Sequence, residues 1–363
     1  MCNLFFNVFL NITPAQFINI FYAFLLMPLL LFVIILGFTI YKIRMGRQTK
    51  LWQESIVMLI SESIFISDED EPVDVANKYN KLMQIGDFRQ CLINEIITIK
   101  KGLSGASTDN LVKLYENLSL NHESYGKLKA EPWHIKAKGI QELALMDQKK
   151  YVKEIFKLTN DTNELVRNEA QCALICFYGF PGLRFLNVTV YPISQLQQIQ
   201  LLNALYLVKG ENFEDIKRWM ESAIESVIEF ALKLATFYNC YQVYDQVIES
   251  MQNPNLQIKL SALAYLKNLP QEDSPSEIIK TYSFESKTYK LAILDTLKII
   301  GSEEQVPFLL QQLQNEDDDI KSAAAKSLSQ LHPIGAAFFQ SHVFADQLPW
   351  KNIFLQNMNE RAA

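Results

Sequence analysis

A nine-residue pattern recurs at a near-constant spacing from residue 135 onward. It begins with a β-branched aliphatic residue and a cation, has a small residue at its fifth position in most copies, and ends in leucine. Four copies are clear: 135–143, 166–174, 258–266 and 320–328. Weaker copies begin at Gln197, Val227 and Tyr289, so successive starting positions are separated by 31, 31, 30, 31, 31 and 31 residues. A period of this kind indicates a repeat protein built from one supersecondary unit.

The pattern itself predicts a pair of helices in each unit. Its first, fifth, eighth and ninth positions share one face of a helix, so these residues are expected to point inward. Another apolar-periodic stretch precedes it, as at 151–156 and 306–313, and is interpreted as the first helix of the pair. Polar turns such as 159–163 and 315–319 join the two. Because one pair cannot bury its apolar face alone, neighbouring pairs must stack into a solenoid.

The unit resembles a HEAT-like repeat of a short kind. The likeness rests on the two-helix unit, its period, and a turn with Asp or Asn followed by an aliphatic residue, a cation and, three residues later, alanine. It covers about residues 118–332, or about seven repeats. The stretch 111–139, with Trp133-His134-Ile135-Lys136, also resembles the entry to the repeats in membrane-anchored bacterial HEAT proteins. The resemblance implies an all-α chain whose body is a right-handed α-solenoid.

The N-terminal segment predicts a membrane anchor. Residues 1–41 contain no charged side chain, and 17–41 are almost entirely Phe, Leu, Ile, Val, Met and Tyr. A helix needs roughly 20 apolar residues to cross the hydrocarbon core, so 17–41 is predicted to be a transmembrane helix. The basic start, short apolar core and cleavage site of a signal peptide are lacking. Cations that favour the cytoplasmic side follow at once: Lys42, Arg44, Arg47 and Lys50.

This charge asymmetry predicts a single-pass protein of the cytoplasmic (inner) membrane, with residues 1–16 outside and the soluble body inside. Residues 42–72 are expected to form a juxtamembrane helix and an acidic linker, 73–117 a helical cap before the repeats, and 333–363 a helical cap after them. One face of the juxtamembrane helix is apolar and carries Trp52, Ile56, Leu59 and Ile60.

Composition argues against several classes of function. The net charge is −6 and the pI is near 5.4, so there is no basic field to bind nucleic acid. Four histidines occur, and none stands at metal-ligand spacing from another: His122, His134, His332 and His342. No phosphate-binding glycine loop or HExxH motif is present. The sequence therefore predicts no catalysis, cofactor or metal site.

Two cysteines one helical turn apart, Cys172 and Cys176, have the spacing to share a metal ion. Metal sites in proteins need further ligands, and no companion pair is near in the sequence. The preferred interpretation is that both are thiols buried in the core.

The second position of the nonapeptide is the one arrayed polar feature. It holds a cation in five of seven copies, with Gln198 and Ile228 interrupting the series: Lys136, Arg167, Lys259, Lys290 and Lys321. One interpretation is structural, in which each cation pairs with carboxylates or turn carbonyls from the preceding loop, such as those of Asp161, Glu285 or 317–319. Each exposed pair would contribute at most roughly 1 kcal/mol. The other is a basic stripe that binds an acidic peptide or helix of a partner.

The resemblance implies a membrane-tethered cytoplasmic scaffold or adaptor that binds a protein partner, because solenoids present extended surfaces. By bacterial analogy, the expected partner is membrane-associated machinery, such as an integral-membrane enzyme of envelope polysaccharide synthesis. Two alternatives stay open. One is an enzyme or enzyme subunit of the bilin-lyase type with a deep apolar pocket for a hydrophobic cofactor. The other is a structural protein that self-associates through its uncharged N-terminal segment.

Overall fold

The computed structural model describes residues 13–64, 75–103, 105–210 and 213–331. Within these ranges all regular structure is helical, which confirms the predicted all-α class. The predictions for 1–12, for the acidic linker and for the cap at 333–363 concern segments outside the described residues. The chain divides into two compact units, Met1–Ser124 and Tyr125–Ala363, and each is treated by itself below.

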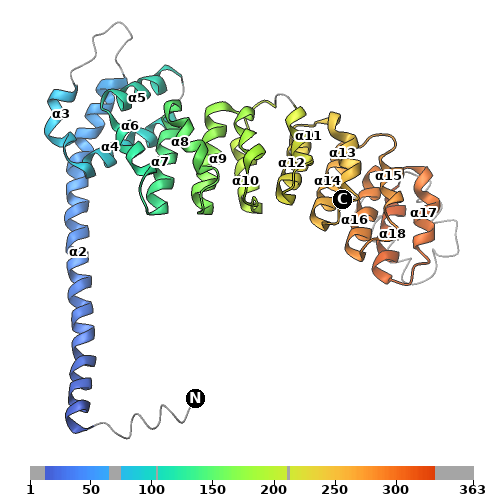
Figure 1. Ribbon diagram of the computed structural model, residues 1–363, viewed down its shortest axis with the longest axis horizontal. Helices are drawn as coiled ribbons and strands as arrows, with labels where there is room; N and C mark the ends of the chain where they lie inside the picture. The colour runs from blue at the N-terminus through green and yellow to red at the C-terminus, as the bar shows by residue number, and fades with distance from the viewer. Residues whose placement is uncertain (1–12, 65–74, 104, 211–212, 332–363) are drawn as a thin grey trace. The chain divides into compact units, whose positions relative to one another are not determined.

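One long helix, α2 (Pro14–Ile64), dominates the first unit (Figure 1). It runs without a break through the predicted transmembrane segment and the juxtamembrane segment, with Pro28 inside it. Its stretch Phe17–Ser61 reaches a mean hydropathy of 2.8, and none of its most apolar window is buried. By length and composition alone, this helix is able to cross a membrane.

Four short helices come next in the described chain, and the C-terminal part of α2 packs against the second and the third of them. They are α3 (Val75–Met83), α4 (Gly86–Gly102), α5 (Ala106–Asn117) and α6 (Leu120–Leu128). All four residues of the expected apolar face of α2 are at most 7% exposed. The ring of Trp52 meets that of Phe88 on α4 edge to face, with centroids 5.8 Å apart. Arg89 Nε on α4 donates to Glu123 Oε2 on α6 at 2.9 Å, which links these two helices.

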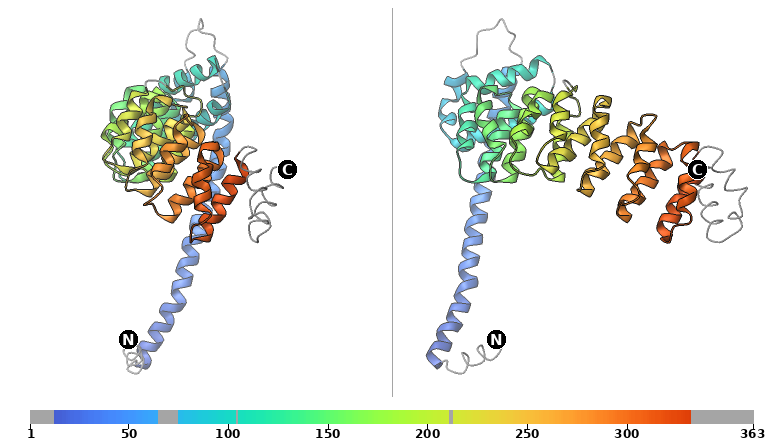
Figure 2. Two further views of the ribbon diagram at one scale, coloured as in Figure 1. Left: turned by 90° about the vertical axis from the view of Figure 1, so that its right-hand side faces the viewer. Right: turned by 45° about the vertical axis from the view of Figure 1, so that its right-hand side comes forward.

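The second unit is a stack of helix pairs, in which we call the first helix of each pair the A helix and the second the B helix (Figure 2). The described B helices are α7 (Trp133–Leu145), α9 (Glu164–Tyr178), α10 (Gln195–Ala204), α12 (Glu225–Phe237), α14 (Leu256–Asn268), α16 (Lys287–Ile300) and α18 (Asp318–Gln330). Every predicted starting position is the third residue of its B helix. The register read from the sequence is therefore confirmed throughout.

The inward positions of the nonapeptide are buried as expected. The fifth and ninth positions are buried in all seven described copies, from Gly139 and Leu143 to Ala324 and Leu328. The first position is buried in all of them except Ile135, which is 36% exposed on α7. The small residues at the fifth position of α7 and α9, Gly139 and Ala170, let the backbones of these neighbouring helices approach closely.

The A helices are shorter. They are α6, α8 (Val152–Leu158), η2 (Phe180–Val188), α11 (Glu214–Met220), α13 (Tyr244–Ser250), α15 (Ser274–Lys280) and α17 (Val306–Gln312). Single 3-10 turns lead into three of them: η1 (Lys149–Tyr151), η3 (Tyr241–Val243) and η4 (Glu303–Gln305). The third A element, η2, is entirely 3-10. A Cβ added at Gly182 would lie 2.3 Å from the Leu174 carbonyl oxygen, so glycine permits the close packing of η2 on α9.

Neighbouring repeats are also joined at the N-termini of their B helices. The first residue of one B helix contacts the N-cap residue of the next, 30 residues further on. Ser194 Oγ donates to Glu164 Oε1, and Asn255 Nδ2 donates to Glu225 Oε2, both at 2.7 Å. The N-cap side chains also accept from the first turns of their own helices, which satisfies backbone donors that a helix leaves unpaired.

Candidate protein-binding surface

The cations at the second position of the nonapeptide are bound within the chain. Lys136 Nζ lies 3.1 Å from Asp161 Oδ2, and Lys259 Nζ forms an ion pair with Glu285. Both carboxylates belong to the A–B turn of the following repeat, 25 and 26 residues further along. These two lysines therefore join consecutive repeats.

The remaining three cations make contacts of different kinds. Arg167 Nη1 donates to the carbonyls of Asp161 and Thr162 at 2.9 and 3.0 Å, which fixes the turn before its own helix. Lys290 Nζ lies over the ring of Tyr282, 5.3 Å from its centroid. Lys321 Nζ pairs with Asp318 Oδ1 at 2.8 Å. Contacts with the preceding turn, as the structural interpretation expects, are made by Arg167 and Lys321. Lys136 and Lys259 pair instead with the turn of the next repeat, and Lys290 lies on an aromatic ring.

Replacing Arg167 with methionine is expected to lower the free energy of unfolding by roughly 1.5–3 kcal/mol, because the charged donor for two turn carbonyls is lost. Arg167 is only 8% exposed, so water does not readily replace it. Lys321→Met is the matched control. Its partner Asp318 is 92% exposed, and the expected loss is below roughly 1 kcal/mol. Urea unfolding followed by circular dichroism measures both, and equal losses would contradict the assignment.

The cation series is interrupted at α10 and α12, where the repeat period also shortens to 30 residues. Long polar side chains bridge these two helices. Lys233 Nζ on α12 donates to Gln195 Oε1 and Gln198 Oε1 on α10, both at 2.7 Å, and lies 2.8 Å from Glu229 Oε1. Gln195 Nε2 also donates to Glu229 Oε1 at 2.7 Å. We call this network of Gln195, Gln198, Glu229 and Lys233 the polar seam.

Glu229 is only 5% exposed, yet the polar seam keeps it charged. Burial would by itself raise the pKa of its carboxyl group. Hydrogen bonds from Lys233 and Gln195, together with the charge of Lys233, outweigh burial and hold the pKa below its usual value. The seam therefore carries a fixed pair of opposite charges at neutral pH.

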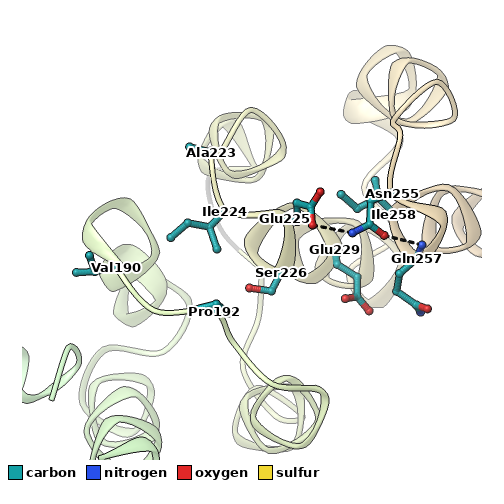
Figure 3. A pocket seen from close by; sticks show the side chains of 10 residues that line it. All are labelled: Val190, Pro192, Ala223, Ile224, Glu225, Ser226, Glu229, Asn255, Gln257 and Ile258. Carbon is teal, nitrogen blue, oxygen red and sulfur yellow. Dashed lines mark hydrogen bonds between the residues drawn. The ribbon is translucent and has the colours of Figure 1, made fainter. Parts of the chain in front are cut away.

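A cavity of about 520 Å³ opens beside the polar seam, at the N-termini of α12 and α14 (Figure 3). One side is apolar, with Val190, Pro192 and Ile224, and the other carries Glu225, Glu229 and Asn255. The further lining residues are Ala223, Ser226, Gln257 and Ile258. The loop before α10 is fixed to α12 because Ile193 N donates to Ser226 Oγ at 2.8 Å.

Exposed apolar side chains lie on the two B helices that precede the cavity. Leu196 and Ile199 on α10 are 61% and 54% exposed, and Leu165 on α9 is 49% exposed. Leu165 and Leu196 occupy equivalent positions in consecutive repeats. Sequence reasoning missed this surface and the cavity. The available signal was the pair of irregularities at one place, namely the 30-residue step and the gap in the cation series.

The prediction of two buried core thiols is wrong for Cys176, which is exposed, while Cys172 is partly buried. A spacing of four residues puts both on one face of α9, where Cys172 packs against the hydrophobic core and Cys176 is exposed. Burial, followed by the nearby charge of Glu169, raises the pKa of the Cys172 thiol to about 12. Within the described residues, no group of three or more His, Cys, Asp or Glu is placed to hold a metal ion.

The alkylation rate of Cys172 is expected to rise about tenfold per pH unit from about pH 7 to pH 10 without levelling off, because only the thiolate reacts. A cysteine with the ordinary pKa near 8.5 levels off above about pH 9. Iodoacetamide labelling followed by mass spectrometry gives the profile, and the same residue in the urea-unfolded chain is the control. A plateau near pH 9 in the folded chain would overturn this prediction.

The fold defines an α-solenoid of stacked helix pairs, a class of protein-binding scaffold. Residues 244–329 match the family of HEAT repeats, and the same register extends through the described repeats before them. The prediction of HEAT-like repeats is thereby confirmed. A comparison with curated proteins found no match.

Three solved structures resemble the chain distantly. One engineered protein is 11% identical with a TM-score of 0.31, covering 84% of this chain and 88% of its own. A second is 14% identical with a TM-score of 0.24, covering 70% and 96%. A designed armadillo repeat protein in complex with the peptide (KR)4 is 11% identical with a TM-score of 0.24, covering 75% and 98%. At TM-scores this low the likeness carries no functional information.

Proposed function

We propose that this chain is a membrane-tethered cytoplasmic scaffold whose B helices bind a segment of a membrane-associated protein. The observation that carries the proposal is the coincidence of three features at α9, α10 and α12: exposed apolar side chains, a cavity and a break in the repeat regularity. The cations at the second position of the nonapeptide are already engaged: Lys136 and Lys259 join consecutive repeats, and Arg167 and Lys321 contact the start of their own helix. A partner competing for them would have to break these contacts.

The anchor part of the proposal is supported by α2. Its apolar stretch is followed by the basic flank at residues 42–50, and positive residues favour the cytoplasmic side. The tether would hold the solenoid near other proteins of the same membrane, which raises its effective concentration for such partners. An integral-membrane enzyme of envelope polysaccharide synthesis is one such partner that we propose, by bacterial analogy alone.

The chemistry of the surface favours an apolar partner segment that carries a positive charge. Leu196 and Ile199 offer apolar contact area, and removing such area from water is the main driving force of association. Glu225 stands exposed at the cavity, and its carboxylate accepts a hydrogen bond from the neutral side-chain amide of Asn255. A lysine or arginine of the partner would therefore meet a negative charge beside an apolar wall.

Photocrosslinking in native membranes tests the proposal. A photoreactive residue at Leu196 is expected to give a reproducible protein adduct, and Ile199→Glu is expected to abolish it, since a charge would be buried on binding. The matched control is a photoreactive residue at Ile299 on α16, which is 54% exposed against 61% for Leu196 but lies two B helices beyond α12. Equal adduct yields at the two positions, or no adduct at either position, would contradict the proposed surface.

The same experiment separates the alternatives. An adduct with a second copy of the chain would favour the self-associating structural protein. A bilin-lyase-type enzyme calls for a deep apolar pocket, whereas the cavity described here is lined on one side by two carboxylates and an amide. A coloured purified protein would favour that alternative over a scaffold.

A further inference from the structure

Charge is unevenly distributed along the A helices. The segment formed by η1 and α8 carries Lys149, Lys150, Lys153 and Lys157, all exposed, against one acidic residue, Glu154, for a net charge of +3 over residues 149–158. We call these four lysines the α8 patch. Lys149 and Lys150 are adjacent, and Lys153 and Lys157 follow after three and four residues, so all four lie along one side of the segment. The buried residue of α8 is Ile155, on the opposite side.

The later A helices have the opposite sign. Residues 241–250, 272–280 and 303–312, which form η3–α13, the α15 region and η4–α17, each carry a net charge of −2. The A side of the stack is therefore positive at its start and negative towards its end. A surface whose only role is to contact water gives no reason for positive and negative residues to be separated along the stack.

The contacts around the α8 patch leave its charges available. Lys149 Nζ lies 3.4 Å from Asp147 Oδ1, and both side chains are about half exposed, at 51% and 53%, so this pair is weak. Lys150 lies over the ring of Tyr151, 5.3 Å from its centroid. Tyr151 stacks on Tyr125 at 4.5 Å, and Lys129 covers the far ring at 4.8 Å. An aromatic face positions an ammonium group without neutralising its charge.

Phe156 adds an apolar element to this surface, because it is 39% exposed on α8 between Lys153 and Lys157. Exposed lysines with an interspersed aromatic side chain are typical of surfaces that lie on anionic bilayers, where lysines approach the headgroups and an aromatic ring enters the interface. An acidic protein groove would also attract the lysines. Binding to an acidic groove would not explain why the later A helices are negatively charged. Binding to an anionic bilayer would explain it, because the bilayer would repel those helices and so orient the stack.

We infer that the α8 patch docks on anionic lipid headgroups of the membrane that holds the anchor. This inference rests on the proposed tether, which confines the repeats beside the bilayer and makes even a weak contact effective. The second unit begins at Tyr125, directly after the unit that contains α2, so α8 belongs to the start of the tethered stack. The acidic later repeats would then be directed away from the surface, leaving their B helices open to a partner.

Lysine acylation of the full chain in nanodiscs tests this inference. Discs of phosphatidylcholine alone are compared with discs that also contain phosphatidylglycerol, using a water-soluble reagent and mass spectrometry. The four lysines of the α8 patch are expected to react several-fold more slowly in the anionic discs. At about 1 M salt, where the Debye length is about 3 Å, the difference should vanish. Lys280, which is 67% exposed on acidic α15, is the internal control and should not change.

A Lys153→Glu, Lys157→Glu variant should lose the protection of Lys149 and Lys150 while keeping the reactivity of Lys280. Equal acylation of the patch in both kinds of disc would overturn the inference. Protection in native membranes but not in anionic discs would also overturn it and would indicate an acidic protein as the ligand. Failure of the chain to insert into either disc would instead contradict the proposed tether.

Discussion

Phe230→Ala is expected to lower the free energy of unfolding by about 3–5 kcal/mol, the largest effect of a single substitution that we predict for the solenoid. Phe230 lies on α12, is fully buried and belongs to the core cluster that runs through the repeats. Its removal takes away aromatic contacts and leaves a cavity that neighbouring helices cannot fill, because each is fixed by its own partners. The loss should be greatest at α12 and its neighbours α11 and α14.

Phe237→Ala on the same helix is the matched control, since Phe237 is 37% exposed and should lose well under half as much. Because repeat arrays need not unfold in one step, hydrogen exchange by mass spectrometry is the preferred measurement. Phe230→Ala should accelerate exchange in 214–268 more than in 306–330. Uniform acceleration along the whole solenoid would contradict a stack of nearest-neighbour units.

The fold could be predicted because its information is local and repeated. Each nonapeptide places an aliphatic residue, a small residue and leucine on one helix face, and the structure puts all seven starting positions at the same place in their B helices. A helical period that is repeated seven times averages out weak copies, such as the one at Gln197, which carries no aliphatic residue at its first position. Such periodicity is the strongest signal that a single sequence provides.

Departures from regularity could be noticed in the sequence but not explained there. Nothing in the spacing showed that η2 would be a 3-10 element, because that outcome depends on the close approach of Gly182 to Leu174. The exposure of Cys176 could not be predicted from the sequence either, because Cys is usually buried, whereas this position on α9 is exposed. Long-range packing decides both.

The candidate site was hidden for a related reason. The cation series drew attention to Lys136 and Lys259, whose partners lie in the next repeat and become visible only in three dimensions. The polar seam is equally long-range, since Lys233 reaches Gln198 across 35 residues of sequence. The irregularity in the sequence lies at the place where a binding surface is now proposed. Only the three-dimensional contacts show which residues form that surface.

For the anchor, the free energy gained by inserting its apolar residues can be compared with the cost of inserting an arginine. Seventeen of the residues 17–41 are Phe, Leu, Ile or Val, which together favour insertion by roughly 5–10 kcal/mol on the insertion scale. One arginine at the centre of the helix costs only about 2.5–3.5 kcal/mol. Most molecules with a single arginine should therefore remain in the membrane, whereas most molecules with three arginines should not.

The triple variant Leu26→Arg, Leu30→Arg, Ile34→Arg is accordingly expected to release the chain from the membrane into the alkaline-carbonate supernatant, while Leu30→Arg alone stays in the pellet. The three residues share one face of α2 and are 58%, 64% and 60% exposed, so no packing of the soluble body is disturbed. The same three positions changed to alanine form the matched control, which should remain in the pellet because alanine is nearly neutral for insertion. If the triple arginine variant stayed in the pellet with its solenoid folded, the body would hold the membrane by another route, and α2 would not be the necessary anchor.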